Sequence, residues 1–237
     1  MFYSKKIERL FFGRICVEMI RGSGESMGFI RIFWDRREFF LVCLLEHIRI
    51  SLTAVVCAGV LGILAGIFIS GRKKTAAMVL GIINVIYTVP SISLLGFLIP
   101  FTGIGNRTAV IALTVYGLLP IVRNTYTGLV NVDAGILEVA QGLGADGKQS
   151  LLRIRLPLAL PVIISGFRNM VVMIIAMGGI ASFIGAGGLG AAIYRGITTY
   201  NMTLTAAGSL LIALLALLSD WLLSKVEKAV NRRYGIG

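Results

Sequence analysis

The sequence predicts an all-α polytopic membrane protein with about five transmembrane helices. Of its 237 residues, 57% are hydrophobic and only 14% are charged, and the mean hydropathy is +0.88. About a quarter of the residues of a typical soluble domain are charged, so this composition indicates an integral membrane protein. Five apolar stretches also have the length of about 20 residues that a helix needs to cross a bilayer.

The chain before the first stretch, residues 1–48, is expected to be an N-terminal extension followed by an interfacial segment. Residues 1–26 contain neither a long apolar run nor the features of a signal peptide. They end in a Gly- and Ser-rich sequence, which favours translation from Met27 or a dispensable extension. Residues 28–47 have the pattern of an amphipathic segment, with Arg31, Arg36 and Arg37 toward the lipid headgroups.

A single transmembrane domain is expected over residues 49–228, with a cytoplasmic tail at 229–237. The expected spans are residues 50–70, 76–100, 108–129, 158–182 and 201–223. The second span is interrupted by a proline in its middle, and the third also contains a proline. In the first span, a helically spaced stripe of glycines is expected to let helices pack closely: Gly59, Gly62 and Gly66.

The distribution of basic residues predicts which ends of the spans face the cytoplasm. Cytoplasmic loops of membrane proteins carry an excess of Lys and Arg. Residues 72–74, a polar loop at 133–157 and the C-terminal tail are basic and fall on one side of a five-span topology. The N-terminus is then outside, where basic residues within 31–37 conflict with the rule. Either this N-terminal segment is translocated, which we prefer, or a short segment within 39–50 re-enters the membrane.

The net charge of +12 and the few reactive side chains exclude several functions. The positive charges lie mostly at the ends of apolar stretches, so topology and contact with membrane lipid explain them better than nucleic acid binding. Cys16, Cys43 and Cys57 do not have metal-ligand spacing, and the single histidine, His47, is expected to be structural. No catalytic constellation is evident, so we predict that the chain is not an enzyme and holds no metal.

Two glycine-rich runs have the spacing G-x-G-x-x-G, but neither predicts a nucleotide site. The runs at 142–147 and 185–190 do not follow a strand of a βαβ unit, and neither has an acidic residue about 20 positions later. The phosphate-binding pattern G-x-x-x-x-G-K-[ST] is absent from the sequence. The chain is therefore expected to bind no cofactor, and any ATP and Mg²⁺ that drive it must bind to a separate subunit.

The polar loop at residues 133–157 must lie in water because charged residues and glycines recur along it. We expect a short helix at 138–143, a break at Gly144 and a turn at 145–147, since glycine adopts conformations that other residues avoid. The chain then leads back to the fourth span. Such a loop is a rigid protrusion, and its small residues permit close insertion into a partner.

The spacing within this loop resembles the EAA loop of ABC importer permeases. The pattern E-A-A, three residues, G, nine residues, I-x-L-P is matched by Glu138, Ala140, Gly144, Ile154, Leu156 and Pro157. Val139 stands where that family more often has Ala. The resemblance implies the type I permease fold of these importers and a multi-pass location in the bacterial cytoplasmic membrane. It also implies that the loop docks on the ATPase, through Glu138, Ala140, Gly142, Gly144, Ala145, Asp146, Leu156 and Pro157.

Further stretches resemble the osmoprotectant branch of the family: YTVPSISLLGFLIPFTGIG at 87–105, LPIVRNTYTGL at 119–129 and FIGAGGLG at 183–190. The resemblance implies an importer of glycine betaine, choline and carnitine. It also implies two ABC ATPase subunits, a second permease subunit that is identical or similar, and an extracellular substrate-binding protein. Methionine permeases share runs similar to FIGAGGLG, so an amino-acid importer is the alternative within the family. A secondary transporter or channel is the alternative from another class, but the sequence shows neither an internal repeat nor an intramembrane relay of ionisable residues.

Polar and aromatic residues near the break in the second span are candidates for the substrate pathway. Pro90 frees backbone carbonyls, which are tolerated where a helix lines a cavity. The aromatic candidates either offer a ring face to a trimethylammonium group or simply pack. Arg168 is expected to line the pathway or to pair with a backbone carbonyl or Glu138, whereas Arg123 is expected to extend to the cytoplasmic membrane surface. The pathway candidates are Asn84, Tyr87, Thr88, Pro90, Ser91, Tyr116 and Arg168.

Overall fold

A computed structural model describes residues 32–234, and within this part of the chain every regular element is a helix. Four helices are long and apolar enough to cross a membrane, and the bent pair α4–α5 makes a fifth crossing if it is counted as one span. The all-α membrane fold is thus confirmed. The elements are α3 (Arg37–Ser70), α4 (Lys73–Thr88), α5 (Ser91–Thr102), α6 (Asn106–Val130), α7 (Ala134–Gly142), α8 (Gly147–Gln149), η1 (Ser150–Arg155), α9 (Leu156–Gly178), η2 (Ile180–Ile184), α10 (Gly190–Thr198) and α11 (Met202–Tyr234).

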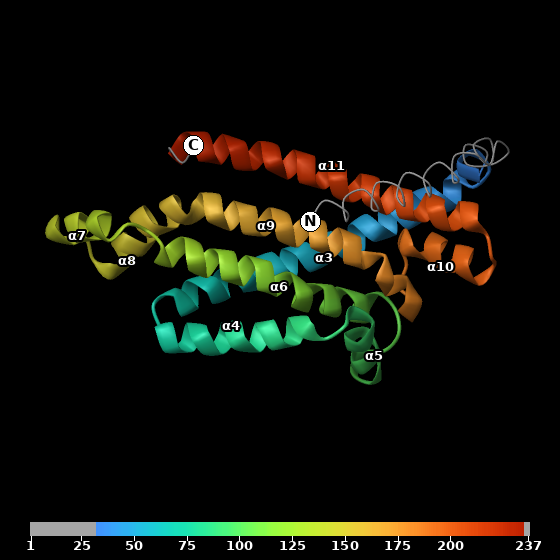
Figure 1. Cartoon of the computed structure of the whole chain (residues 1–237), viewed down its shortest axis with the longest axis horizontal. Coiled ribbons are helices and arrows are strands. Elements are labelled where there is room, and N and C mark those ends of the chain that lie inside the picture. The colour runs from blue at the N-terminus through green and yellow to red at the C-terminus, as the bar shows by residue number, and fades with distance from the viewer. Residues whose placement is uncertain (1–31, 235–237) are drawn as a thin grey trace, which may run out of the picture.

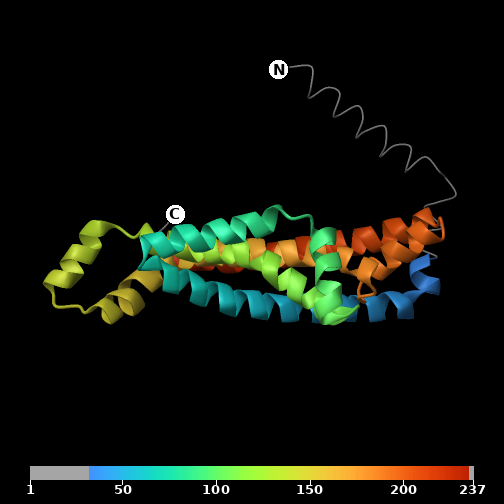
Figure 2. The same cartoon turned by 90° about the horizontal axis from the view of Figure 1, so that it is seen from below.

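The long helices lie side by side in an elongated bundle (Figures 1 and 2). Helix α6 lies between α3 and α9 and contacts both, α4 lies along α6, and α11 lies along α9. Helices α7 and α8 project from one end of the bundle, while α5 and α10 lie toward the other end (Figure 1). The core is apolar, and side chains such as Ile121, Met170 and Ile174 are fully buried between the helices.

Close packing of α3 on α6 depends on small residues, as the glycine stripe predicts. A Cβ atom added at Gly62 would lie 2.2 Å from Cγ2 of Ile121, and one added at Gly66 would lie 2.5 Å from Cβ of Thr125. Both distances are far shorter than a van der Waals contact, so any side chain at these positions would push the two helices apart. The stripe therefore serves helix packing, which is the usual role of small residues between membrane helices.

The first helix begins much earlier than expected. Helix α3 starts at Arg37 and continues without interruption through residues 48 and 49, where the sequence suggested a domain boundary. Its 34 residues give a length of about 51 Å at 1.5 Å per residue, against about 30 Å for the hydrocarbon core. One polar residue near the expected start is directed into the protein: His47 is 1% exposed and its Nε2 lies 3.0 Å from the carbonyl oxygen of Ile175. The structural role expected for His47 is confirmed, and residues 1–31, including Met27, lie outside the described residues.

The second expected span is broken. Helices α4 and α5 meet at an angle of 99° around Val89 and Pro90. Pro90 has no backbone N–H, and the residue before a proline avoids the helical conformation, so Val89 is extended with ψ 128°. The interruption expected within 76–100 is thus confirmed at Pro90, and it is sharp enough to divide the stretch into two helices.

The basic segments lie at one end of the bundle, as the charge distribution predicts. The turn between α3 and α4, the polar loop and the C-terminal end of α11 are all found at the end from which α7 and α8 project (Figure 1). The start of α3 lies at the opposite end (Figure 1). Helix α11 runs on to Tyr234, beyond the end expected at 223, so residues 229–234 continue the last helix rather than form a separate tail.

The outer segment between α9 and α11 is more ordered than a glycine-rich loop suggests. It contains η2 and α10, and Ala192 of α10 packs against Phe40, Leu204 and Ala207. The run FIGAGGLG is tied to the bundle by its backbone, because the Gly188 N–H donates to Oε2 of Glu46 and the Gly187 N–H donates to Oδ1 of Asn106.

Candidate functional site

The polar loop is a helical protrusion whose first helix, α7, is capped by its own sequence. Oδ1 of Asp133 accepts hydrogen bonds from the backbone N–H groups of Gly135, at 2.7 Å, and Ile136, at 3.2 Å. These are donors that the first turn of a helix leaves unpaired. The helix therefore begins at Ala134, earlier than the expected start at residue 138.

Gly144 ends α7 in a left-handed backbone conformation, as expected for a glycine that breaks a helix. Its φ is +85°, in the left-handed region, and its N–H donates to the carbonyl of Gln141 at 2.9 Å. The N–H of Ala145 donates to the carbonyl of Ala140 at 3.0 Å. These two hydrogen bonds form a Schellman motif, in which the residue after the C-cap is left-handed and is most often glycine. The predicted break at Gly144 is thus confirmed.

Asp146 starts the return path of the loop. Its Oδ1 accepts a hydrogen bond from the Gln149 N–H at 2.6 Å, while Oε1 of Gln149 accepts one from the Asp146 N–H at 3.2 Å. This reciprocal pair is a capping box, which fixes the start of α8. The chain then passes through a π-helical turn at Ser150–Arg155 into α9. Pro157 is the second residue of α9, which follows this π-helical turn directly.

The protrusion carries an exposed apolar face that the sequence reasoning missed. Ile136, Val139 and Leu143 are 45%, 64% and 85% exposed. Their spacing of three and four residues places them on one side of α7. The small residue Ala140 is instead buried within the loop, at 7% exposure. Exposed apolar groups that gather on one face are typical of an interaction surface.

Glu138 lies on α7 beside this face. Its side chain is exposed and makes neither a hydrogen bond nor an ion pair with any other residue that the structure describes. Gly142 is also exposed, and a Cβ added there would have no atom within 4 Å. The free carboxylate and the apolar side chains leave the tip of the loop available to a partner.

The break in the second span brings the two predicted tyrosines together. The ring centroids of Tyr87 and Tyr116 lie 5.9 Å apart with an interplanar angle of 69°, an edge-to-face arrangement. The Tyr116 hydroxyl donates to the carbonyl of Val89 at the break, and the Tyr87 hydroxyl donates to Sδ of Met173 at 3.6 Å. Tyr116 is only 4% exposed, whereas Tyr87 is 44% exposed. Tyr116 therefore supports the break, and Tyr87 is the more exposed of the two rings.

A cavity of about 410 Å³ adjoins Tyr87, between α4, α6 and α9. Of the predicted pathway residues, it contains Tyr87 alone. Three of the others are exposed outside the cavity: Asn84, Thr88 and Pro90. Ser91 is half-buried. The Thr88 hydroxyl donates to the carbonyl of Val85 in its own helix. The cavity is lined by Tyr87, Leu119, Pro120, Arg123, Asn124, Thr127, Asn169 and Met173.

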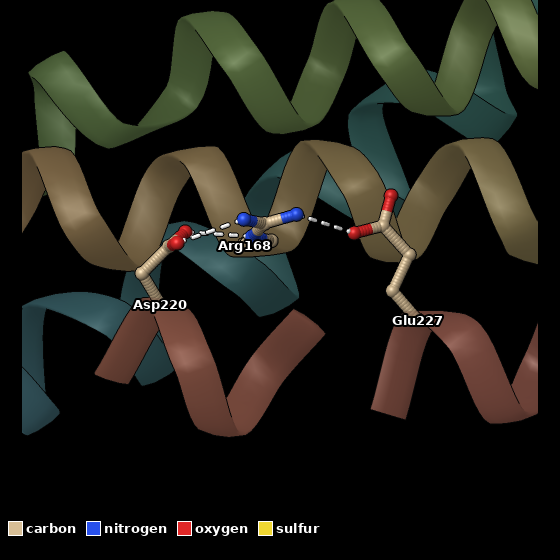
Figure 3. Close-up of polar contacts among 3 residues, drawn as sticks. All are labelled: Arg168, Asp220 and Glu227. Atoms are coloured by element: carbon tan, nitrogen blue, oxygen red, sulfur yellow. Dashed lines mark hydrogen bonds and ion pairs between the residues drawn. The ribbon is translucent and has the colours of Figure 1, made fainter. Parts of the chain in front are cut away.

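Arg168 does not line this cavity, because it is paired with the last helix (Figure 3). Its Nε and Nη2 donate to the two carboxylate oxygens of Asp220 at 2.6 and 2.8 Å, and its Nη1 donates to Oε2 of Glu227 at 2.8 Å. The expected partners, Glu138 or a backbone carbonyl, were wrong. Asp220 and Glu227 are two helical turns apart on one face of α11, a spacing that was visible in the sequence. Pairing of this kind reduces the cost of placing a guanidinium in a membrane.

Residues 58–232 match the family described as binding-protein-dependent transport system inner membrane component. The chain belongs to this family. It is therefore a membrane component of a transport system, not an enzyme, and it resides in the bacterial cytoplasmic membrane. Family membership also implies two kinds of partner, an ATPase and a substrate-binding protein. The secondary transporter and the channel are excluded as alternatives.

Related permeases match most of the chain. The glycine betaine/carnitine/choline permease OpuCB of Bacillus subtilis is 38% identical over 78% of this chain and 86% of its own length. The ergothioneine transport permease/binding protein EgtU of Helicobacter pylori is 44% identical over 74% of this chain, which spans only 32% of that longer protein. Among solved structures, the inward-facing MetNI methionine transporter aligns with a TM-score of 0.72 and 25% identity, over 78% of this chain and 93% of the other.

Proposed function

We propose that this permease imports small quaternary-amine solutes, with glycine betaine, choline and carnitine as the first candidates. The observation that carries the proposal is the similarity to OpuCB over nearly its whole length. Glycine betaine, choline, carnitine and ergothioneine, the solutes in the names of the related permeases, all contain a trimethylammonium group. The exposed ring of Tyr87 supports the proposal, because the face of an aromatic ring attracts such cations.

The protrusion supports a coupling of transport to ATP. We propose that two ATPase subunits, which hold the ATP and Mg²⁺, each receive one α7–α8 loop in a groove. The exposed apolar face of α7 supports this docking, with Glu138 beside it. The capped ends at Asp133 and Asp146, together with the Schellman motif at Gly144, make the loop stiff enough to transmit force.

The complete pathway requires a second permease subunit, identical or similar to this one. The cavity beside Tyr87 lies at the surface of a single five-span chain, so a second chain is needed to enclose it. An extracellular binding protein would deliver the solute at the end of the bundle where α5 and α10 lie. Closure of the ATPase pair would then move the loops and open the pathway to the cytoplasm.

A methionine importer is the second candidate, because a methionine transporter is among the solved structures that align with this chain. Competition uptake separates the two. The permease, expressed with its partner subunits in cells that lack osmolyte importers, is expected to import labelled glycine betaine, and excess choline or carnitine should displace the label. Displacement by methionine alone, or methionine uptake without betaine uptake, would reject the quaternary-amine assignment and leave the coupling argument in place.

A further inference from the structure

The cavity beside Tyr87 has two chemically different ends. Along α6 its lining runs from Leu119 to Thr127, about 12 Å at 1.5 Å per residue. Tyr87 and Met173 lie toward the middle of the bundle, because Tyr87 is at the far end of α4 from its cytoplasmic start. Arg123 and Thr127 lie closer to the cytoplasmic end of α6. One end is therefore aromatic, and the other is cationic.

Arg123, which was expected to extend to the cytoplasmic membrane surface, is exposed and lines this cavity without a paired charge among the described residues. The two carboxylates that neutralise Arg168 come from α11, and no residue that the structure describes gives Arg123 an ion pair or a side-chain hydrogen bond. The part of the cavity lining around it is polar but carries no carboxylate: Asn124, Thr127 and Asn169. A guanidinium within a membrane helix needs a partner or water. The lining thus provides donors for an anion and no resident anion to occupy them.

The amides beside Arg123 suit a carboxylate. One N–H of the Asn124 amide donates to the carbonyl of Pro120 at 2.8 Å, which fixes the side chain and leaves its second N–H unused. Asn169 is exposed and, among the described residues, forms no side-chain hydrogen bond. An arginine with flanking amide donors matches the geometry of a carboxylate, and charge-assisted hydrogen bonds of this kind are the strong ones.

We propose that this cavity is a solute site selective for zwitterions, with the carboxylate at Arg123 and the trimethylammonium group at Tyr87. This inference rests on the proposed function and adds a second selectivity step within the membrane. Glycine betaine and carnitine carry both groups, whereas choline has the cation and no carboxylate. The fixed charge of Arg123 favours the first two and repels the third.

The test compares solutes in one set of variants. Initial uptake of labelled glycine betaine, carnitine and choline is measured for the wild type, Arg123→Gln, Arg123→Lys and the control Arg233→Gln, with the same partner subunits and equal expression. Loss of a charge-assisted hydrogen bond is expected to lower kcat/KM for betaine and carnitine about tenfold or more in Arg123→Gln, with choline unchanged or improved. Arg123→Lys should recover part of the loss because it keeps the charge.

The outcomes separate the inference from the function on which it rests. The binding protein is the same for every variant, so a change in the betaine-to-choline ratio reports the permease alone. Equal loss for all solutes, no loss for any, or a wild type that prefers choline overturns the zwitterion site while the proposed function stands. A wild type that imports no trimethylammonium solute overturns both.

Discussion

Gly144 offers the sharpest test of the coupling loop. If its backbone conformation matters, the Asn variant should be more active than the Ala variant; if its small size matters, the order should be reversed. The φ of +85° lies in the left-handed region, and a Cβ added there meets no atom within 4 Å. Alanine at this position therefore meets no steric clash, and only its unfavourable left-handed backbone destabilises the loop, by about 1 kcal/mol. Asparagine is larger but tolerates this conformation better than alanine.

A destabilisation of about 1 kcal/mol changes the population of the docking-competent loop about fivefold. The expected order of ATPase association and of ATP-driven uptake is Gly, then Asn, then Ala. Gly147→Ala is the matched control, because Gly147 begins α8 with free space around an added Cβ and without a left-handed φ. Copurification of the ATPase and initial uptake rates measure both effects. An order of Gly, Ala, Asn would show that the size of the residue matters and would refute the Schellman argument.

Three other changes test separate parts of the account. Leu143→Asp is expected to weaken ATPase copurification about tenfold or more without changing permease stability, since this side chain is 85% exposed and its burial on docking is lost. Arg168→Gln is expected to lower the thermal midpoint of the purified permease, because it leaves Asp220 and Glu227 without their partner, and adding Asp220→Asn should restore part of the loss; no recovery would contradict a pairing role. Gly62→Val is expected to prevent stable folding, because the new side chain would clash with Ile121 of α6. The control Gly81→Ala should fold normally, because no atom lies within 4 Å of its added Cβ. Equal membrane yields of the two variants would argue against close packing of α3 on α6.

Local sequence rules predicted the features that a short stretch determines. The length of apolar runs predicted the spans, Pro90 predicted the break, and Gly144 predicted the end of α7. Each depends on a residue and its immediate neighbours, through burial, a missing N–H or a left-handed backbone. The family pattern in the loop added the fold and the partners that local rules alone do not provide.

Features that depend on contacts between distant helices were not predicted. The partner of Arg168 is on α11, and nothing within α9 indicates it. Glu46 bonds to the loop after η2 and His47 to α9, so these polar residues lie within α3, whereas the apolar stretch alone placed the start of the helix after them. Arg123 and Asn169 meet at one cavity only because α6 and α9 pack together. The apolar face of α7 was visible in the sequence as helical spacing, but the emphasis on small residues obscured it.

The most direct test of the central claim is transport in reconstituted vesicles. The permease is assembled with its ATPase and binding protein, and labelled glycine betaine is supplied outside. The account predicts accumulation that requires ATP and Mg²⁺ on the ATPase side, stops when the ATPase is inactivated, and is displaced by carnitine or choline. Accumulation driven by an ion gradient without ATP, or ATP-driven uptake of methionine and not betaine, would contradict it.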